Sequence, residues 1–258
     1  MASFKNVDIY LAFAEEQITK REYSPEEFDH FVEIAFGSQY GLDVHGIHKW
    51  NHDVRIQIIG KATAEDKATL NRITTELNSL VQGISIVIVH SVPTTKLYFA
   101  SPSKFTLIEP HYIPPHIAFY WSRWDAASII ESTILIASEG ITQHKRDHHI
   151  VAMMTKNLGL MNRSSSLPPE SIFFNGETES IFLVDIDRAI VQILYDASIR
   201  HGMTVDETRA ALPVSSVDVV TRASGQLSAP HYCPNCGSGL EGTEQYCGTC
   251  GSPVTSMN

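Results

Sequence analysis

The sequence has few cysteines, and all four lie between positions 233 and 250. It also lacks long apolar runs: its most apolar segments, such as 128–138, are far shorter than the roughly 20 residues that span a bilayer. The N-terminus has no basic region followed by a longer apolar run, as a signal peptide would have. These absences predict a cytoplasmic protein with no membrane-spanning segment.

Basic residues are also scarce, with 19 Lys and Arg against 29 Asp and Glu and a formal net charge of −10. Nucleic-acid binding depends largely on Lys and Arg that neutralise phosphates, so this balance disfavours a nucleic-acid partner. Three motifs are missing as well: the Gly-x-Gly-x-x-Gly loop, the Walker A loop and the Gly-x-Ser-x-Gly elbow. The sequence therefore points to neither a common nucleotide site nor a serine-hydrolase site.

The chain is long and apolar enough to bury a sizeable core, since 43% of its 258 residues are hydrophobic. We expect helices over 8–20 and after Ser24, where Pro25 and Glu27 complete the start signal. Residues 53–60 alternate as in a strand, and Thr63 begins an amphipathic helix that runs to about Gly83.

The middle of the chain is rich in β-forming residues, and its last third returns to helical patterns. Strands are expected in four segments: 84–90, 96–100, 117–124 and 132–138. Three helices should follow, within 148–160, 185–199 and 204–212. Aromatic residues of one strand (Phe119, Trp121, Trp124) are interpreted as strand and core positions, and three carboxylates near helix starts (Asp185, Asp187, Asp206) as caps. The pattern predicts an α/β or α+β domain, with a mixed sheet and flanking helices.

Three parts are expected along the chain. Residues 1–212 should form the large domain, and 213–230 are small, polar and without apolar periodicity, which indicates a linker. Residues 231–258 should form a small module.

That module contains two Cys-x-x-Cys pairs, formed by Cys233, Cys236, Cys247 and Cys250. Each pair can place two sulfurs on one side of a tight turn, and two such turns complete a tetrahedral shell for Zn²⁺. Two disulfides are the alternative, but they require an oxidising compartment. The spacing predicts a zinc ribbon with one structural Zn²⁺ per chain. From Ala223 onward it has no Lys or Arg, which favours a protein-facing or structural ribbon over a nucleic-acid-binding one.

Five segments of the large domain resemble, in order, the bacterial family of domains of unknown function 2927. They are VEIAFGSQYG, IHKWNHDVRIQIIG, LGLMN, PPESIFF and LYDASIRHGMTVDETRAAL, and the resemblance covers most of residues 28–212. The family is similar to zincin-type metallopeptidases, whose long helix carries His-Glu-x-x-His-x-Leu-Gly-Leu. The family itself usually has Glu-Glu-x-x-Gln-x-Leu-Gly-Leu there. The resemblance thus implies a zincin-like fold with a degenerate site.

Counting back from the Leu-Gly-Leu at 158–160 places each position that zincin chemistry requires. The first metal ligand falls on Ala152, the general base on Met153 and the second ligand on Lys156. Arg163 stands where the family would place an acid after Asn162. None of these side chains can perform the zincin role.

A histidine-rich stretch one turn earlier offers an alternative site. His144 and His148 have ligand spacing on a helix, and His149 adjoins them, but no Glu lies between them to act as a base. Helical periodicity places His148 opposite the buried Ile150, near solvent. Glu131 and Glu139 are the nearest candidate third ligands in the sequence.

We therefore predict a non-catalytic zinc-binding protein, in which a degenerate metallopeptidase-like domain or the ribbon binds a protein partner. One alternative is a metal-dependent hydrolase that uses His144, His148 or His149. A second alternative is nucleic-acid binding through the ribbon.

Overall fold

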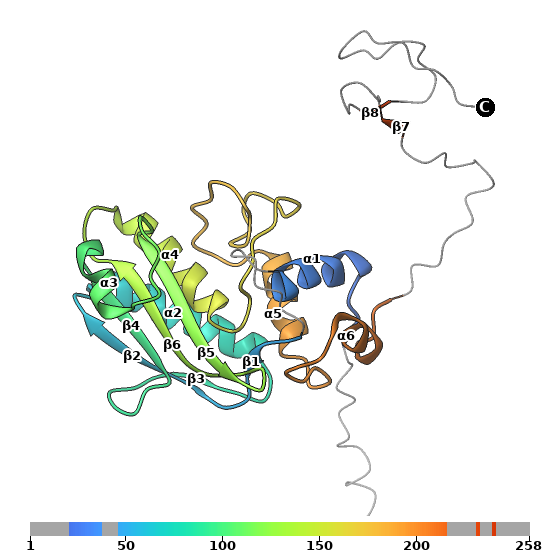
Figure 1. Ribbon diagram of the computed structural model, residues 1–258, viewed down its shortest axis with the longest axis horizontal. Coiled ribbons are helices and arrows are strands. Elements are labelled where there is room, and N and C mark those ends of the chain that lie inside the picture. The colour runs from blue at the N-terminus through green and yellow to red at the C-terminus, as the bar shows by residue number, and fades with distance from the viewer. Residues whose placement is uncertain (1–20, 38–45, 216–230, 233–238, 241–258) are drawn as a thin grey trace, which may run out of the picture. The chain divides into compact units, whose positions relative to one another are not determined.

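The computed structural model describes residues 21–37 and 46–215, and the backbone of two short strands at 231–232 and 239–240. The chain divides into two compact units, 1–216 and 217–258. The first unit contains the sheet and all the helices drawn in Figure 1. Within the described residues, no helix is long and apolar enough to cross a membrane.

A six-stranded mixed sheet forms the centre of the first unit. Its path runs β1-β6-β4-β2-β3, and β5 pairs with β6 on a separate branch. All pairs are parallel except β5 with β6, which is antiparallel. The strands are β1 Lys49–Trp50, β2 Val54–Gly60, β3 Ile86–Ile88, β4 Thr95–Ala100, β5 Ala118–Asp125 and β6 Ser128–Ala137.

Six α-helices flank this sheet in the described residues. They are α1 Pro25–Phe36, α2 Ala64–Leu80, α3 Phe105–Ile108, α4 Gln143–Lys156, α5 Asp185–Leu194 and α6 Val205–Ala211, with a 3-10 turn at Pro102–Lys104 before α3. The predicted fold class, a mixed α/β sheet with flanking helices, is therefore confirmed. The short β1 and α3 were missed because their runs are too brief to show a period. The helix expected over 8–20 lies outside the described residues.

Helix starts follow the sequence signals closely. Ser24 accepts a hydrogen bond from the Glu27 amide, and the Glu27 carboxylate accepts one from the Ser24 amide. Thr63 begins α2 by the same reciprocal arrangement with Asp66. Asp187 caps α5 by accepting from the Val184 amide, so its interpretation as a cap is correct.

The two faces of the sheet pack against different neighbours. Because side chains alternate along a strand, Ile134 and Ile136 of β6 face one side while Leu135 faces the other. The isoleucines belong to the main core, which includes the buried faces of α2 and α4. Leu135 belongs to a smaller cluster with Phe105, Tyr112, Phe119 and Ala137. The helix α4 therefore lies on the face that carries the main core.

The turn after α4 requires glycine. Gly159 has φ +113°, and a Cβ there would lie 1.9 Å from the His48 carbonyl oxygen. Trp50 Nε1 donates to the Asn157 oxygen at 2.7 Å, and Tyr195 Oη donates to the Leu158 oxygen at 2.9 Å. These contacts fix the end of α4 against β1 and α5. The Leu-Gly-Leu pattern thus reflects two buried leucines and one close backbone approach.

The two described ends of the first unit pair with each other. Tyr23 donates its backbone amide to the Pro213 oxygen at 3.1 Å, and the Ser215 amide donates to the Tyr23 oxygen at 3.0 Å. Tyr23 and Val214 form an isolated β-bridge. Residues 213–215, the first of the expected linker, are thus hydrogen-bonded to the start of the described chain.

Candidate functional site

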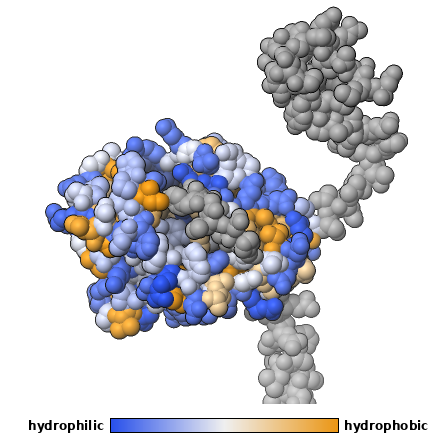
Figure 2. Space-filling view, in the orientation of Figure 1, coloured by the Kyte–Doolittle hydropathy of each residue, from blue (hydrophilic) through white to orange (hydrophobic). Residues whose placement is uncertain are grey.

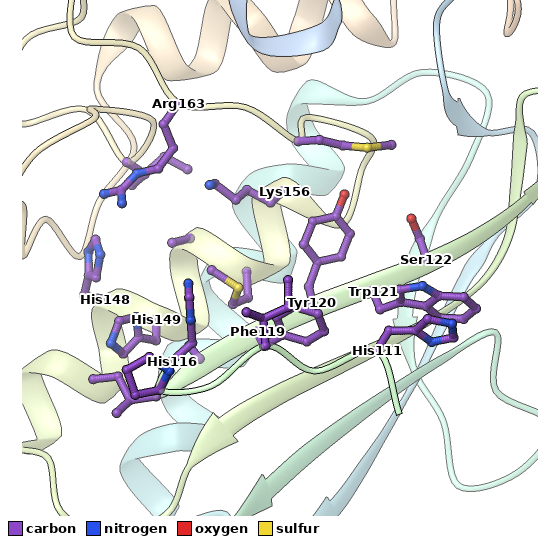
Figure 3. Close-up of a pocket in the computed structure, with 18 of the residues that line it drawn as sticks. His111, His116, Phe119, Tyr120, Trp121, Ser122, His148, His149, Lys156 and Arg163 are labelled. Atoms are coloured by element: carbon purple, nitrogen blue, oxygen red, sulfur yellow. The ribbon is translucent and has the colours of Figure 1, made fainter. Parts of the chain in front are cut away.

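A pocket of about 810 Å³ lies between α4 and the edge strand β5 (Figure 3). It has three walls. The helix contributes five side chains, the segment 111–124 a second wall, and the chain after α4 a third. The lining residues used below are Lys156, Arg163, His148, His149, Ala152, Met153, His111, His116, Tyr120, Trp121 and Trp124.

Polar contacts to α2 hold the first turns of α4 in place. Thr142 begins the helix by accepting a hydrogen bond from the Lys145 amide. The fully buried Asp66 of α2 accepts from Gln143 Nε2 at 2.8 Å and pairs with Arg146 at 3.3 Å. A buried pair of this kind fixes the position of two elements even where its net free energy is small. The pocket face of α4 is therefore rigidly oriented.

The three positions counted back from Leu-Gly-Leu all line this pocket. Ala152 and Met153 lie on the wall formed by α4, and Lys156 lies one turn further along the same wall. Two metal ligands and a base at these positions would thus have faced a cavity. A methyl group, a thioether and an ammonium do not form a zinc site with a general base, so the side chains present do not fit a catalytic zinc here.

Lys156 is the most unusual of these residues. It is only 6% exposed, and the part of the chain described shows no hydrogen bond or ion pair to its ammonium group. Burial, and then the charge of Arg163, lower its pKa to about 7. Buried ammonium groups are costly unless they are paired. Lys156 therefore contributes a buried amine to the wall of the pocket.

Arg163 lies half-buried beside Lys156. Its guanidinium donates one hydrogen bond to the Gly176 oxygen at 3.2 Å and forms no ion pair with any described carboxylate. Its positive charge also lowers the pKa of His148 and His149. In Figure 3 the ends of Lys156, Arg163 and His148 point toward the same side of the pocket. The charge at this side is positive.

The placement of His148 near solvent was wrong. His148 is 7% exposed, and its Nδ1 lies 2.7 Å from the Ser180 oxygen, because the chain that leads into α5 covers this side of the helix. Burial is the main reason that its pKa is lowered, and burial likewise brings the pKa of His149 to about 4. The rings of these two histidines are 5.2 Å apart. Both line the pocket as neutral groups at pH 7.

The other proposed ligands lie elsewhere. His144 is exposed and 3.8 Å from Glu179. Glu131 pairs with Arg123 at 2.6 Å, and Glu139 is exposed; neither lines the pocket. No group of three or more His, Cys, Asp or Glu that could hold a metal occurs among the residues that the structure describes. The four cysteines lie outside them.

The wall formed by 111–124 was only partly predicted. Phe119 is a core residue as expected, and Trp121 packs against the same smaller cluster. Both also line the pocket with Trp124, and the His111 ring stacks on Trp121 at 4.5 Å with an interplanar angle of 5°. The dense aromatic and histidine content of 111–124 was a signal for this wall. The sequence alone, however, does not distinguish the aromatic residues of an edge strand from those of a central strand in the core.

Two features of the pocket follow from these contacts. Its described lining contains four histidines, one lysine and one arginine, and no Asp or Glu, although the whole chain is acidic. One wall is an edge strand, because β5 pairs only with β6 in the described sheet. The molecule is thus a mixed α/β protein with a basic, aromatic pocket beside an open strand edge.

Comparison with known proteins gives the family. The chain belongs to the family described as "Protein of unknown function (DUF2927)", whose model matches residues 26–214. Two solved structures of myroilysin are similar to this chain, with TM-scores of 0.40 and 0.39 and sequence identities of 11% and 12%. The matches cover 57% and 58% of this chain and 86% and 97% of those chains. No curated protein matches the chain.

Proposed function

We propose that the first unit is a peptidase-like binding domain that holds a segment of another protein in the pocket without cutting it. One observation carries this proposal: Ala152, Met153 and Lys156 line the pocket at the positions where zincin chemistry requires two ligands and a base. The cavity is retained, while side chains that could activate water through zinc are replaced. A pocket that has room for a peptide but no zinc ligands and no general base is suited to binding the peptide without cleaving it.

The open edge of β5 supports an extended peptide as the ligand. A strand edge offers unpaired backbone donors and acceptors, and an added strand obtains much of its affinity from them. Beside this edge, Tyr120 and Trp121 contribute aromatic rings to the lining of the pocket (Figure 3). Trp124 of the same strand also lines it. Backbone pairing would supply affinity, and the aromatic surface would select side chains.

The test uses the full chain and a library of acetylated random hexapeptides. Immobilised protein should retain a subset of the library, and mass spectrometry should recover those peptides uncut, with and without added Zn²⁺. Cleavage that disappears in His148→Ala would instead support the metal-dependent hydrolase. Retention of no peptides would overturn the proposal.

A variant pair locates the binding. Ala152→Phe places a ring into the pocket and should abolish retention, whereas Ala68→Phe adds the same ring to the exposed face of α2. Ala68→Phe should bind as the unmodified protein does. Thermal melting shows whether each variant folds, and Trp121→Ala tests the opposite wall if Ala152→Phe does not.

We also propose that Cys233, Cys236, Cys247 and Cys250 hold one structural Zn²⁺ in a ribbon that faces a protein. The strands β7 His231–Tyr232 and β8 Gly239–Leu240 support this, because they pair antiparallel on both sides of the segment that contains the first cysteine pair. A reducing, cytoplasmic compartment belongs to the proposal, since it keeps the thiols available to metal.

Elemental analysis tests the ribbon. The full chain should carry one zinc, and a Cys233→Ser/Cys236→Ser double variant none. Zinc retained by the double variant would redirect attention to His144, His148 and His149. Salt-dependent binding of DNA or RNA by the full chain, lost in the double variant, would favour the nucleic-acid alternative.

A further inference from the structure

The side of the pocket formed by Lys156 and Arg163 is positively charged and has no described counter-charge. Lys156 is more than nine-tenths buried and its ammonium faces the cavity (Figure 3). In the described part of the chain, neither cation pairs with a carboxylate, and no Asp or Glu lines the pocket. Other buried ionic groups of this domain have polar partners: Arg146 pairs with Asp66, Lys49 donates to two carbonyl oxygens and Asp187 accepts from Ser171. The pocket is therefore the exception within the fold.

From this geometry we propose that a carboxylate of the bound peptide, from its C-terminus or from an Asp or Glu side chain, sits between Lys156 and Arg163. The inference rests on the proposed peptide-binding function and specifies the group that the pocket selects. A buried ammonium loses its hydration and regains favourable interactions only when an anion or acceptor reaches it. A guanidinium beside it offers a planar pair of donors that matches a carboxylate.

The donors around the site favour a carboxylate over a phosphate. Phosphate sites in proteins usually include amide donors from a helix N-terminus or a nest of amides. Lys156 instead ends α4, where the helix dipole is negative, and the first turn of α4 does not line the pocket. The ammonium of Lys156 and the planar guanidinium of Arg163 match the two oxygens of a carboxylate.

The rest of the pocket fits the body of a peptide. Met153 and Ala152 continue the wall away from Lys156, and Tyr120 faces them from β5, while Trp121 lines the pocket from the other face of that strand. A ligand with an anionic end and an apolar body would place the end against the cations and the body against these side chains. A small inorganic anion would leave most of the 810 Å³ unfilled.

Binding should couple to protonation of Lys156, whose pKa is about 7 in the free protein. The charged or titratable groups around it are His148 and His149 on α4, Arg163 after the helix, and His116 and Tyr120 from the opposite wall. A bound carboxylate stabilises the ammonium and raises this pKa. Above pH 7, binding of the peptide is therefore accompanied by uptake of a proton by Lys156. The affinity of the protein for the peptide should fall as the pH rises from 7 to 9.

Matched peptides test the inference directly. Hexapeptides that the library selects are made with a free C-terminal carboxylate and as C-terminal amides, each with and without an internal Asp or Glu. Isothermal titration calorimetry on the full chain should show a loss of at least about tenfold on amidation if the C-terminus is the source. If a side chain is the source, the loss follows replacement of Asp or Glu by Asn or Gln.

Variants of the two cations test the same contact from the protein side. Lys156→Met and Arg163→Gln should each lower affinity for the peptide that carries the selected carboxylate by about tenfold, and leave unchanged the affinity for its neutral counterpart, either the C-terminal amide or the Asn or Gln peptide. Lys156→Arg should retain part of the preference. Lys145→Met, on the exposed side of α4, is the matched control and should change neither. If Lys156→Met does not fold, the acid and amide pair on the unmodified protein decides the question alone.

Three outcomes would overturn the inference. Equal binding of acid and amide forms, whatever their internal residues, would remove the carboxylate site and leave the proposed function intact. Inorganic phosphate that displaces the peptide at lower concentration than acetate would assign the cations to a phosphate group. Failure of every peptide to bind would remove the proposed function and this inference with it.

Discussion

Two lysines of this domain are equally buried, yet their surroundings differ. Lys49 in β1 is 8% exposed and Lys156 in α4 is 6% exposed. The Lys49 ammonium donates to the Leu194 and Ile199 oxygens, both at 2.8 Å, and lies 4.8 Å from the Tyr195 ring centroid. Lys156 has no such partners among the described residues. Burial lowers the pKa of Lys49 to about 8, while nearby Asp196 opposes the change.

The comparison separates an amine that holds the fold together from one that is available to a ligand. Lys49 satisfies two carbonyls at the end of α5, where the chain would otherwise have unpaired acceptors. Lys156 satisfies none, so its burial costs free energy that the fold does not recover. Burial alone therefore does not identify a functional lysine, whereas burial beside a cavity without partners does.

The largest difference should appear on replacing each lysine by methionine. Lys49→Met leaves two buried carbonyls without a donor and should reduce the free energy of unfolding by about 4 kcal/mol. Lys156→Met removes an amine whose burial costs free energy, so it should raise the free energy of unfolding at pH 7, by roughly 1–3 kcal/mol. Urea denaturation at pH 7 measures both. A loss in Lys156→Met as large as that in Lys49→Met would show that Lys156 supports the fold.

Gly159 lies where the end of α4, which carries Lys156, approaches β1, which carries Lys49. Its Cα approaches β1 so closely that an added Cβ would lie 1.9 Å from the His48 oxygen and 3.5 Å from the Lys49 Cα. Gly159→Ala should therefore lower the free energy of unfolding by about 3 kcal/mol, through backbone displacement and strain at positive φ. Thermal denaturation provides the measurement. An unchanged melting temperature would mean that the close approach is not needed.

The pH dependence of stability should distinguish the proteins with and without Lys156. Between pH 7 and 9 the unfolded lysine stays protonated while the folded Lys156 loses its proton, so the unfolded state binds more protons. Stability of the unmodified protein should therefore rise over this range relative to Lys156→Met, by about 2 kcal/mol. Lys49 titrates in both proteins and cancels in the difference. Parallel pH profiles would contradict the lowered pKa.

Lys145 should show the smallest effect. It lies on the exposed side of α4, about half exposed and 3.5 Å from Glu179. Exposed ion pairs contribute little, so Lys145→Met should alter the free energy of unfolding by less than about 0.5 kcal/mol. Chemical denaturation beside Lys156→Met makes this a reference for lysine loss from the same helix.

Local patterns predicted the main strands of the sheet and the capped helices. Ser24 and Thr63 begin helices where their sequence signals place them, because caps depend on residues three positions away. The positions counted back from Leu158-Gly159-Leu160, which are Ala152, Met153 and Lys156, lie together on the wall that α4 contributes to the pocket, because the helix is regular between these points. These predictions needed only contacts within a few turns.

The contents of the pocket depend on contacts across long stretches of the chain. His148 is buried because Ser180 lies over it, and no periodicity within α4 shows a segment 32 residues away. Trp121 lines the pocket because β5 is an edge strand, which is a property of the sheet order. The lack of a described Asp or Glu near Lys156 likewise follows only when the three segments that line the pocket are brought together by the fold.

The backbone pairing of Tyr23 with Pro213 and Ser215 makes the first unit nearly a closed ring. Residues 21 and 215 could be joined there by a short connector and new ends opened at an exposed turn, such as the one at Val92 between β3 and β4. In such a circular permutant α4 and β5 would keep their neighbours. The arrangement of elements that forms the pocket therefore does not depend on the order in which those elements are synthesised.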